Sequence, residues 1–170
     1  KNRVITSTEA LNITSLPKHM VIIGAGVIGL ELGSVFARLG TKVEVVEYLD
    51  RILPGMDTDA AKELMRSLKK LGVTFHLSHE VISVKGSKTK AKVEMRRRTG
   101  GDAITLDTDY CLIAIGRRPY TEGLGLENTG VKLDEKGKIN DETGNLNIDR
   151  NRIFKIKQKK EGHKVLHDLS

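Results

Sequence analysis

The chain has 170 residues, 38% of them hydrophobic, which is enough for one main globular domain with a buried core. Its formal net charge is +7, but residues 151–170, with six Lys or Arg and two acidic residues, contribute +4 of it. That uneven distribution, together with three Phe, three Tyr and no Trp, disfavours a nucleic-acid-binding module, which interleaves basic and aromatic residues along its surface.

The first strong pattern is a strand, a glycine-rich turn and a helix in direct succession. Met20–Ile23 is an apolar, partly β-branched run of the kind that fills a buried parallel strand. The spacing Gly24-x-Gly26-x-x-Gly29 follows at once, and a run with helical periodicity then ends at Gly40. Glycines at this spacing are a weak signal alone, but between a strand and a helix they predict a dinucleotide-binding turn.

Each glycine has a physical role in this interpretation. Gly24 permits the sharp turn, Gly26 lets the main chain approach a pyrophosphate, and Gly29 lets the helix pack closely on the sheet. Gly33 and Ala37 continue the row of small residues at four-residue spacing. The diphosphate is expected against unpaired N–H groups at the helix N-terminus. The alternative is an ordinary βαβ turn whose glycines serve packing alone.

Glu47 ends the second predicted strand, Lys42–Glu47, where the ribose-binding acid of this motif belongs. Its carboxylate can accept hydrogen bonds from the adenosine ribose hydroxyls, and a 2′-phosphate there would meet like charge, which favours NAD over NADP. Tyr48 and Leu49 offer no cation to reverse that preference, although Arg51 is near in sequence. The alternative is a solvated glutamate at a strand end.

A second crossover follows the Pro54-Gly55 break. Asp57 or Thr58 is expected to cap an amphipathic helix that ends at Gly72, and Val73–Leu77 is expected to be the third parallel strand. The pattern then changes to short alternating runs separated by glycine turns, typical of a β-meander: Val81–Val84, Ala91–Met95 and Ala103–Leu106. Arg96, Arg97 and Arg98 are interpreted as the exposed end of the middle strand.

Tyr110–Ile115 is a continuous apolar run that predicts a central strand returning to the parallel sheet. It contains the single cysteine, Cys111, which we interpret as a buried packing residue without a redox role. Gly116 then lies at the edge where ligands bind in open α/β sheets, either to leave room for the cofactor or as a plain turn glycine. The predicted fold class is α/β: a Rossmann-like parallel sheet with two crossover helices and an inserted antiparallel β-meander.

Three motifs together resemble the dihydrolipoamide dehydrogenases of the pyridine-nucleotide disulfide oxidoreductase family: VIIGAGVIGLELGSVFARLG, KVEVVE and IAIGRRPYTEGLGLENTGV. The resemblance extends from about Thr6 to Ile139 and implies the NAD domain that interrupts the FAD domain of those enzymes. It implies an NAD site formed by Gly24, Ala25, Gly26, Val27, Ile28, Gly29, Leu30, Glu31, Glu47, Val81 and Gly116. In an intact enzyme Glu31 would lie near the flavin; in this chain we interpret it as a solvated helix carboxylate.

Several parts that the family's chemistry needs are not found in this sequence. One cysteine cannot form the CxxxxC redox pair, and neither the FAD-binding glycine motif nor the catalytic His and Glu of the interface domain is present. We therefore expect no catalytic residue and no metal site here, and a chain that binds NAD without turning over. FAD is expected only in the full-length parent.

The resemblance also implies a parent that is a homodimer within a 2-oxo acid dehydrogenase complex, whereas this chain is expected to be a monomer. No apolar run is long enough to span a bilayer, and residues 1–12 lack the apolar core of a signal peptide. We expect a soluble chain, and the resemblance implies a parent in the bacterial cytoplasm or, in eukaryotes, in the mitochondrial matrix. Alternative functions are a noncatalytic scaffold with an empty nucleotide cleft and, third, a basic nucleic-acid-binding module.

Residues 1–150 are assigned to the NAD-binding domain and residues 151–170 to a divergent basic tail. In the tail, Lys157 and Gln158 stand where the family has the Gly-Asp pair that contacts FAD, so that contact is expected to be lost. Lysines alternate with Phe154 and Ile156, as in a residual strand of the FAD domain with one wet face. The alternative is a disordered or frame-altered end.

Overall fold

A computed structural model describes residues 2–128 and 131–139 of the chain. The chain divides into a first unit, Lys1–Gly116, and a second unit that begins at Arg117. The expected domain boundary at residue 150 and the expected tail strand both lie outside the described residues. Within the described ranges, no helix is long and apolar enough to cross a lipid bilayer.

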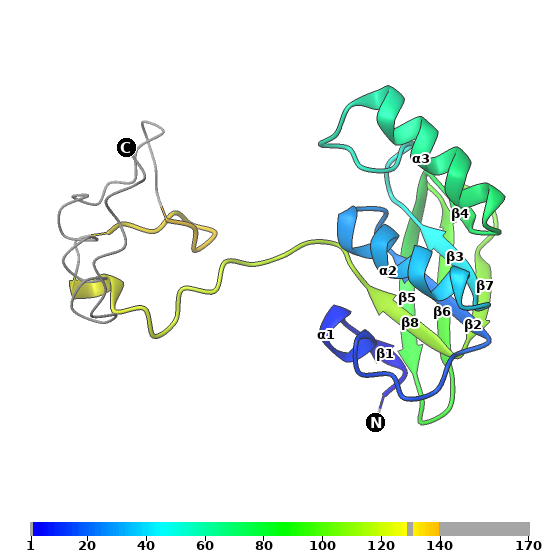
Figure 1. Cartoon of the computed structure of the whole chain (residues 1–170), viewed down its shortest axis with the longest axis horizontal. Helices are drawn as coiled ribbons and strands as arrows, with labels where there is room; N and C mark the ends of the chain where they lie inside the picture. The colour runs from blue at the N-terminus through cyan, green and yellow to red at the C-terminus, as the bar shows by residue number, and fades with distance from the viewer. Residues whose placement is uncertain (1, 129–130, 140–170) are drawn as a thin grey trace. The chain divides into compact units, whose positions relative to one another are not determined.

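The first unit is built on a parallel sheet that contains β1 (Val4–Ile5), β2 (His19–Ile23), β3 (Lys42–Val46), β4 (Thr74–His76) and β8 (Tyr110–Ile113). Their order in the sheet is β1-β8-β2-β3-β4, so β8, the last of these five strands in sequence, lies between β1 and the central strand β2 (Figure 1). Residues Met20 to Ile23 pair with Tyr110 to Ile113 in parallel register. This confirms the predicted return of the apolar run after the meander.

Two helices make the crossovers between neighbouring strands: α2 (Val27–Arg38) joins β2 to β3, and α3 (Thr58–Lys70) joins β3 to β4. Asp57, not Thr58, caps α3, and its carboxylate accepts the N–H groups of Asp59 and Ala60 at 3.0 Å each. Gly40 and Gly72 follow the two helices with φ of +102° and +93°, the left-handed conformation that ends a helix. A short helix, α1 (Ser7–Ala10), follows β1.

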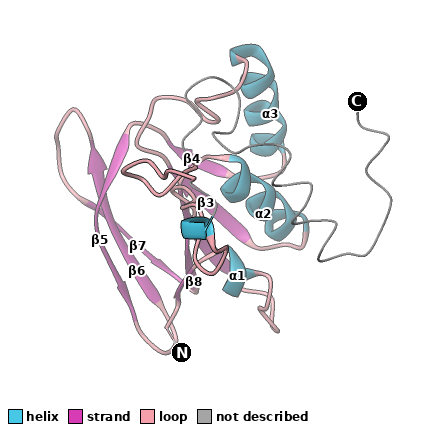
Figure 2. Cartoon of the chain, turned by 90° about the vertical axis from the view of Figure 1, so that its left-hand side faces the viewer, coloured by secondary structure: helices cyan, strands magenta, loops and turns pink. Residues whose placement is uncertain are grey.

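An antiparallel sheet of β5 (His79–Gly86), β6 (Ala91–Arg97) and β7 (Ile104–Thr108) lies between β4 and β8 in sequence. Figure 2 shows α2 and α3 on one face of the parallel sheet and this meander on the other. The predicted meander is confirmed, with longer strands than the apolar runs alone indicated. Arg97 ends β6 and all three arginines are exposed, as predicted.

Side chains of the parallel strands point to both faces of the sheet, and they contribute to two separate hydrophobic cores. Val43 and Val45 pack on the helix side, whereas Val46 and Val21 pack with the meander. Cys111 belongs to the meander-side core and is 0% exposed, and this burial raises the pKa of its thiol to about 12. In the described part of the second unit, residues 126–128 form a 3-10 turn, and Leu133 and Ile139 form an isolated antiparallel bridge.

Candidate functional site

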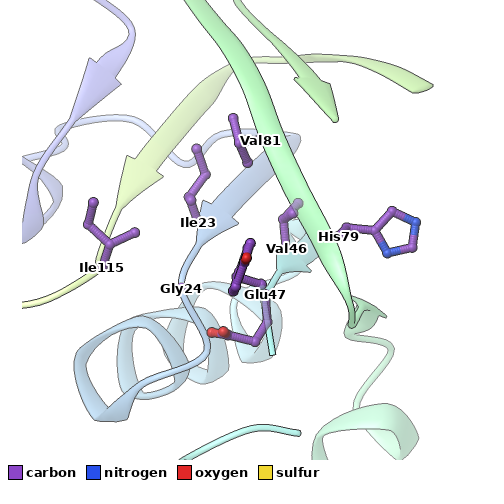
Figure 3. Close-up of a pocket in the computed structure, with 8 residues that line it drawn as sticks. Ile23, Gly24, Val46, Glu47, His79, Val81 and Ile115 are labelled. Atoms are coloured by element: carbon purple, nitrogen blue, oxygen red, sulfur yellow. The ribbon is translucent and has the colours of Figure 1, made fainter. Parts of the chain in front are cut away.

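A cavity of about 340 Å³ opens at the carboxyl ends of the parallel strands, where ligands bind in open α/β sheets. Its walls come from the ends of β2, β3 and β8 and from the start of the meander (Figure 3). Eight residues line it: Ile23, Gly24, Val46, Glu47, Tyr48, His79, Val81 and Ile115. Two of the predicted site residues far apart in sequence, Glu47 and Val81, are therefore brought together with the glycine turn.

The Glu47 carboxylate is directed to the turn between β2 and α2, as Figure 3 shows. The N–H of Ala25 donates to its Oε2 at 2.7 Å, and the N–H of Leu49 donates to its Oε1 at 2.9 Å. A carboxylate offers about four lone-pair sites, so roughly two remain for further donors such as ribose hydroxyls. Two backbone N–H groups thus hold the Glu47 carboxylate in place, and it can still accept further hydrogen bonds beside the cavity.

The three motif glycines are needed for different physical reasons. A Cβ on Gly24, whose φ is +104°, would lie 2.6 Å from the carbonyl oxygen of Ala114, so this turn fits tightly against the end of β8. A Cβ on Gly29 would lie 2.3 Å from the carbonyl oxygen of Gly24, which confirms the predicted close packing of the helix. A Cβ on Gly26 would meet nothing within 4 Å. Gly26 therefore faces open space, where a ligand can approach the backbone.

The first turn of α2 leaves several amides available. The first intrahelical bond is donated by the N–H of Leu30 to the carbonyl of Gly26. The N–H groups of Val27, Ile28 and Gly29 have no acceptor among the residues that the structure describes. With the partial positive charge of the helix N-terminus, they form a site suited to an anion such as a diphosphate.

Some predicted site residues have side chains that do not line this cavity. Ala25 and Leu30 are 0% and 4% exposed, and their side chains belong to the core. Glu31 is exposed and lines a separate groove of about 230 Å³ between α2 and α3. Gly116 is not among the residues that line the cavity beside Glu47, and Ile115 lines it instead.

Sequence reasoning missed the contributions of Tyr48 and His79 to this cavity. Tyr48 directly follows Glu47 and is 53% exposed, so its position beside the predicted ribose-binding acid was the available signal. His79 begins β5, and its N–H donates to the carbonyl of Glu47 at 3.0 Å. That pairing across sheets depends on tertiary structure and has no local sequence signature.

Arg51, the cation that left the NADP question open, is occupied by the loop after β3. Its guanidinium donates to Thr58 Oγ1 at 2.8 Å and to the carbonyl of Met56 at 2.6 Å. This side chain is therefore bound to the segment that caps α3, and the cation nearest to Glu47 along the following loop is held by other groups.

Comparison with known proteins shows the family of this chain. Residues 1–156 match the profile of the family described as pyridine nucleotide-disulphide oxidoreductase. The chain belongs to this family. It is 51% identical over 137 residues to dihydrolipoyl dehydrogenase 3 of Pseudomonas putida, covering 81% of this chain and 29% of that protein. It is 47% identical to a dihydrolipoamide dehydrogenase of Chaetomium thermophilum, covering 80% and 27%.

A solved structure of the HOCl-induced flavoprotein disulfide reductase RclA from Escherichia coli superposes with a TM-score of 0.68 at 34% identity. The match covers 81% of this chain and 30% of that protein. The chain therefore spans less than a third of the length of the relatives it resembles. These matches confirm the family resemblance that the three sequence motifs indicated.

Proposed function

We propose that this chain is the NAD(H)-binding part of a dihydrolipoyl dehydrogenase. The observation that carries the proposal is the convergence of Glu47 and the α2 amides on one glycine turn beside a cavity. The acid and the amides come from two different elements, and a dinucleotide needs both kinds of partner. A ribose needs an acceptor for its hydroxyls, and a pyrophosphate needs donors for its oxygens.

In this proposal the pyrophosphate lies against the N–H groups of Val27 and Ile28, next to the open side of Gly26. The adenosine ribose donates to the remaining lone pairs of Glu47, and the adenosine extends into the cavity. Bound NAD supplies the hydride acceptor. The residues of this chain bind and orient it, and the negative charge of Glu47 disfavours a 2′-phosphate.

For the whole protein we propose the oxidation of dihydrolipoamide through a disulfide and FAD with NAD as acceptor, in a homodimer within a 2-oxo acid dehydrogenase complex. The names of the relatives support this, but a dithiol cycle needs two adjacent sulfurs and this sequence has only Cys111. Cys111 is also fully buried. By itself the chain is therefore proposed to bind NAD(H) without turning over and without binding FAD.

Calorimetric titration with NADH and NADPH tests the proposal. We expect NADH to bind more tightly than NADPH, and Glu47→Ala to weaken NADH binding by about 1.5 to 3 kcal/mol, the range for hydrogen bonds to a charged group. Asp50→Asn is the matched control, because Asp50 is an exposed carboxylate three residues along the same loop. Equal titration curves for the two nucleotides would remove the NAD preference, and equal effects of both variants would remove the role of Glu47.

The competing function is a noncatalytic scaffold that keeps the cavity and leaves it empty. The same titration separates the two, because a scaffold gives no heat of binding with NADH at concentrations well above those of a working dehydrogenase site. No binding by the unmutated, folded chain would reject the NAD(H) proposal.

A further inference from the structure

A cation lies over the aromatic wall of the candidate nucleotide cavity. Tyr48 lines the cavity and remains 53% exposed, and the guanidinium carbon of Arg98 lies 4.1 Å from the centroid of its ring. Tyr48 comes from the carboxyl edge of the parallel sheet, whereas Arg98 follows the last residue of β6 in the meander. The pair therefore joins the two sheets at the rim of the cavity.

The backbone fixes Arg98 in this position. The N–H of Arg98 donates to the carbonyl of Ser78 at 2.9 Å, and the N–H of Ser78 donates to the carbonyl of Leu49 at 2.8 Å. Leu49 is the neighbour of Tyr48, and its own N–H is bound to Glu47. A continuous chain of hydrogen bonds thus runs from the candidate ribose-binding acid to the base of the arginine.

The other arginines of this segment are placed differently. Arg96 pairs with the carboxylate of Glu80. For Arg98, the structure records no carboxylate partner within residues 2–128 and 131–139, and its only side-chain contact recorded there is the Tyr48 ring. Within the described residues, its guanidinium therefore contacts the Tyr48 ring and is not paired with a carboxylate.

An aromatic side chain that is half exposed is free to change rotamer, and a guanidinium over one face of the ring restricts it. Tyr48 also lines the cavity, so the part of the ring that Arg98 does not cover is what a ligand can contact. Purine bases stack on such faces, and a stacked base contributes substantially to binding because every base has a π-face. A ring that is already held in place loses less conformational freedom when the base arrives.

We propose that Arg98 is a positioning residue of the nucleotide site, which holds Tyr48 as the wall against which the adenine end of the dinucleotide packs. The inference rests on the proposed NAD(H) binding and adds a residue from the meander to the site. It gives the inserted meander a role in recognition, since the residue that orders the adenine wall lies at the end of its middle strand.

A double-mutant cycle on NADH affinity tests the inference, with dissociation constants measured by calorimetry on the full chain. Arg98→Ala should raise the NADH dissociation constant by about fivefold, the effect of an exposed cation–π contact. Arg97→Ala is the matched control, since Arg97 is the exposed neighbour with the same charge and no recorded side-chain contact in the described residues. This control should leave the constant within about 1.5-fold, because long-range charge effects are screened by salt.

The cycle measures the effect of Arg98→Ala in two variants of Tyr48. In Tyr48→Phe, which keeps the ring, Arg98→Ala should still weaken binding by about the same factor, and in Tyr48→Ala, which removes it, Arg98→Ala should have no further effect. An arginine that acts only through its charge or through folding would have the same effect in both backgrounds. That result, or equal constants for Arg97→Ala and Arg98→Ala, would overturn the inference. Absence of NADH binding by the unmutated chain would instead reject the proposed function on which it rests.

Discussion

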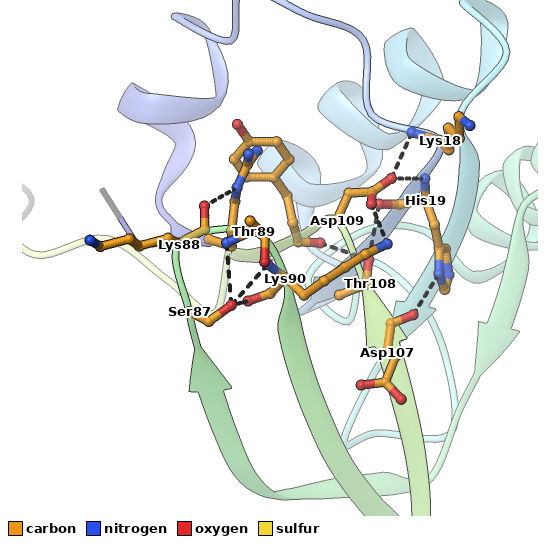
Figure 4. Close-up of polar contacts among 11 residues, drawn as sticks. Lys18, His19, Ser87, Lys88, Thr89, Lys90, Asp107, Thr108 and Asp109 are labelled. Atoms are coloured by element: carbon orange, nitrogen blue, oxygen red, sulfur yellow. Dashed lines mark hydrogen bonds and ion pairs between the residues drawn. The ribbon is translucent and has the colours of Figure 1, made fainter.

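Two carboxylates bind backbone amides at opposite edges of the same parallel sheet, and they differ in what they leave unused. At the amino edge, Asp109 accepts the N–H groups of Lys18 and His19 at 2.8 and 3.0 Å and the Nζ of Lys90 at 2.6 Å (Figure 4). At the carboxyl edge, Glu47 accepts two amides and borders a cavity. Asp109 joins β2, β8 and the turn after β5, whereas Glu47 keeps acceptor capacity for a ligand.

The difference shows how carboxylate–amide hydrogen bonds can serve two purposes at the two edges of one parallel sheet. Around Asp109, the single hydroxyl proton of Thr108 is shared between the carbonyls of His19 and Tyr110, each 3.0 Å from Oγ1, so side chains satisfy the backbone where strands begin. Around Glu47, the neighbouring helix amides lack acceptors in the described structure. Polar groups that are satisfied stabilise the fold, and those that are positioned but unsatisfied prepare a binding site.

The largest effect on the free energy of unfolding is expected from Gly29→Ala at the carboxyl edge. The new Cβ would lie 2.3 Å from the backbone oxygen of Gly24, which cannot move without shifting the whole turn. We expect a loss of about 3 kcal/mol in the free energy of unfolding, at the upper end for overpacking. Gly33→Ala is the control: its Cβ would meet the flexible end of Ile22 at 3.0 Å, and the gain in helix propensity offsets that contact. Equal losses in urea unfolding would contradict the argument.

Replacing each of the two carboxylates by a neutral residue should show that the two edges of the sheet have different roles. Asp109→Ala leaves two amides and Lys90 without their acceptor, and we expect it to lower the free energy of unfolding by about 2 kcal/mol and to leave NADH affinity unchanged. Glu47→Gln keeps an acceptor for the Ala25 amide, so we expect a stability change under about 1 kcal/mol and a reduced preference for NADH over NADPH.

Chemical denaturation and nucleotide titration of both variants provide the measurements. The separation of roles fails if Asp109→Ala weakens NADH binding as strongly as Glu47→Ala does, at a concentration where the variant is fully folded.

Much of this arrangement could be predicted from sequence because its signals are local. The apolar run before Gly24, the helical periodicity up to Gly40 and the alternation after His79 each specify an element without reference to the rest of the chain. The position of Glu47 at the end of β3 followed from the same reasoning. What failed was the detection of short elements, since β1 and α1 contain two and four residues and show no periodicity.

The side-chain contacts that define the cavity were not predictable, because they join segments distant in sequence. Tyr48 and Arg98 are fifty residues apart and meet only because the meander folds against the end of β3. The choice of Asp57 over Thr58 as the helix cap was also open, since both side chains can accept N–H groups. Tertiary placement, not residue type, decided the contact between Tyr48 and Arg98.

Acid should weaken the amino edge in a pH window set by its carboxylates. The hydrogen bond from Lys90, and further bonds from the amides of His19 and Lys18, hold the pKa of Asp109 below its ordinary value although partial burial opposes this. Burial raises the pKa of Glu44, but hydrogen bonds from Lys42 and His76 outweigh it and the net pKa is lowered. Both groups therefore contribute stability that is present above their unfolded pKa values and lost as pH falls through the folded ones.

We expect the midpoint of urea unfolding to be nearly constant above about pH 5 and to fall below about pH 4, near the reference values of Asp and Glu. Asp109→Asn should flatten that fall, because the variant has no proton to take up at this position. Parallel curves for the two proteins below pH 4 would show that Asp109 does not contribute to the acid sensitivity.

The smallest effect is expected for chemical modification of Cys111 in the native chain, because this residue lies in the core between the two sheets. Burial raises the pKa of this thiol to about 12, and the side chain is 0% exposed, so neither the thiolate nor access for a reagent is available at neutral pH. Alkylation by iodoacetamide should therefore proceed only through unfolding, with a rate that rises with urea as the unfolded fraction rises. Gly29→Ala should accelerate it in proportion to its loss of stability, and Gly33→Ala should not. Rapid labelling of the native chain at a rate independent of urea would show that the two sheets separate without global unfolding.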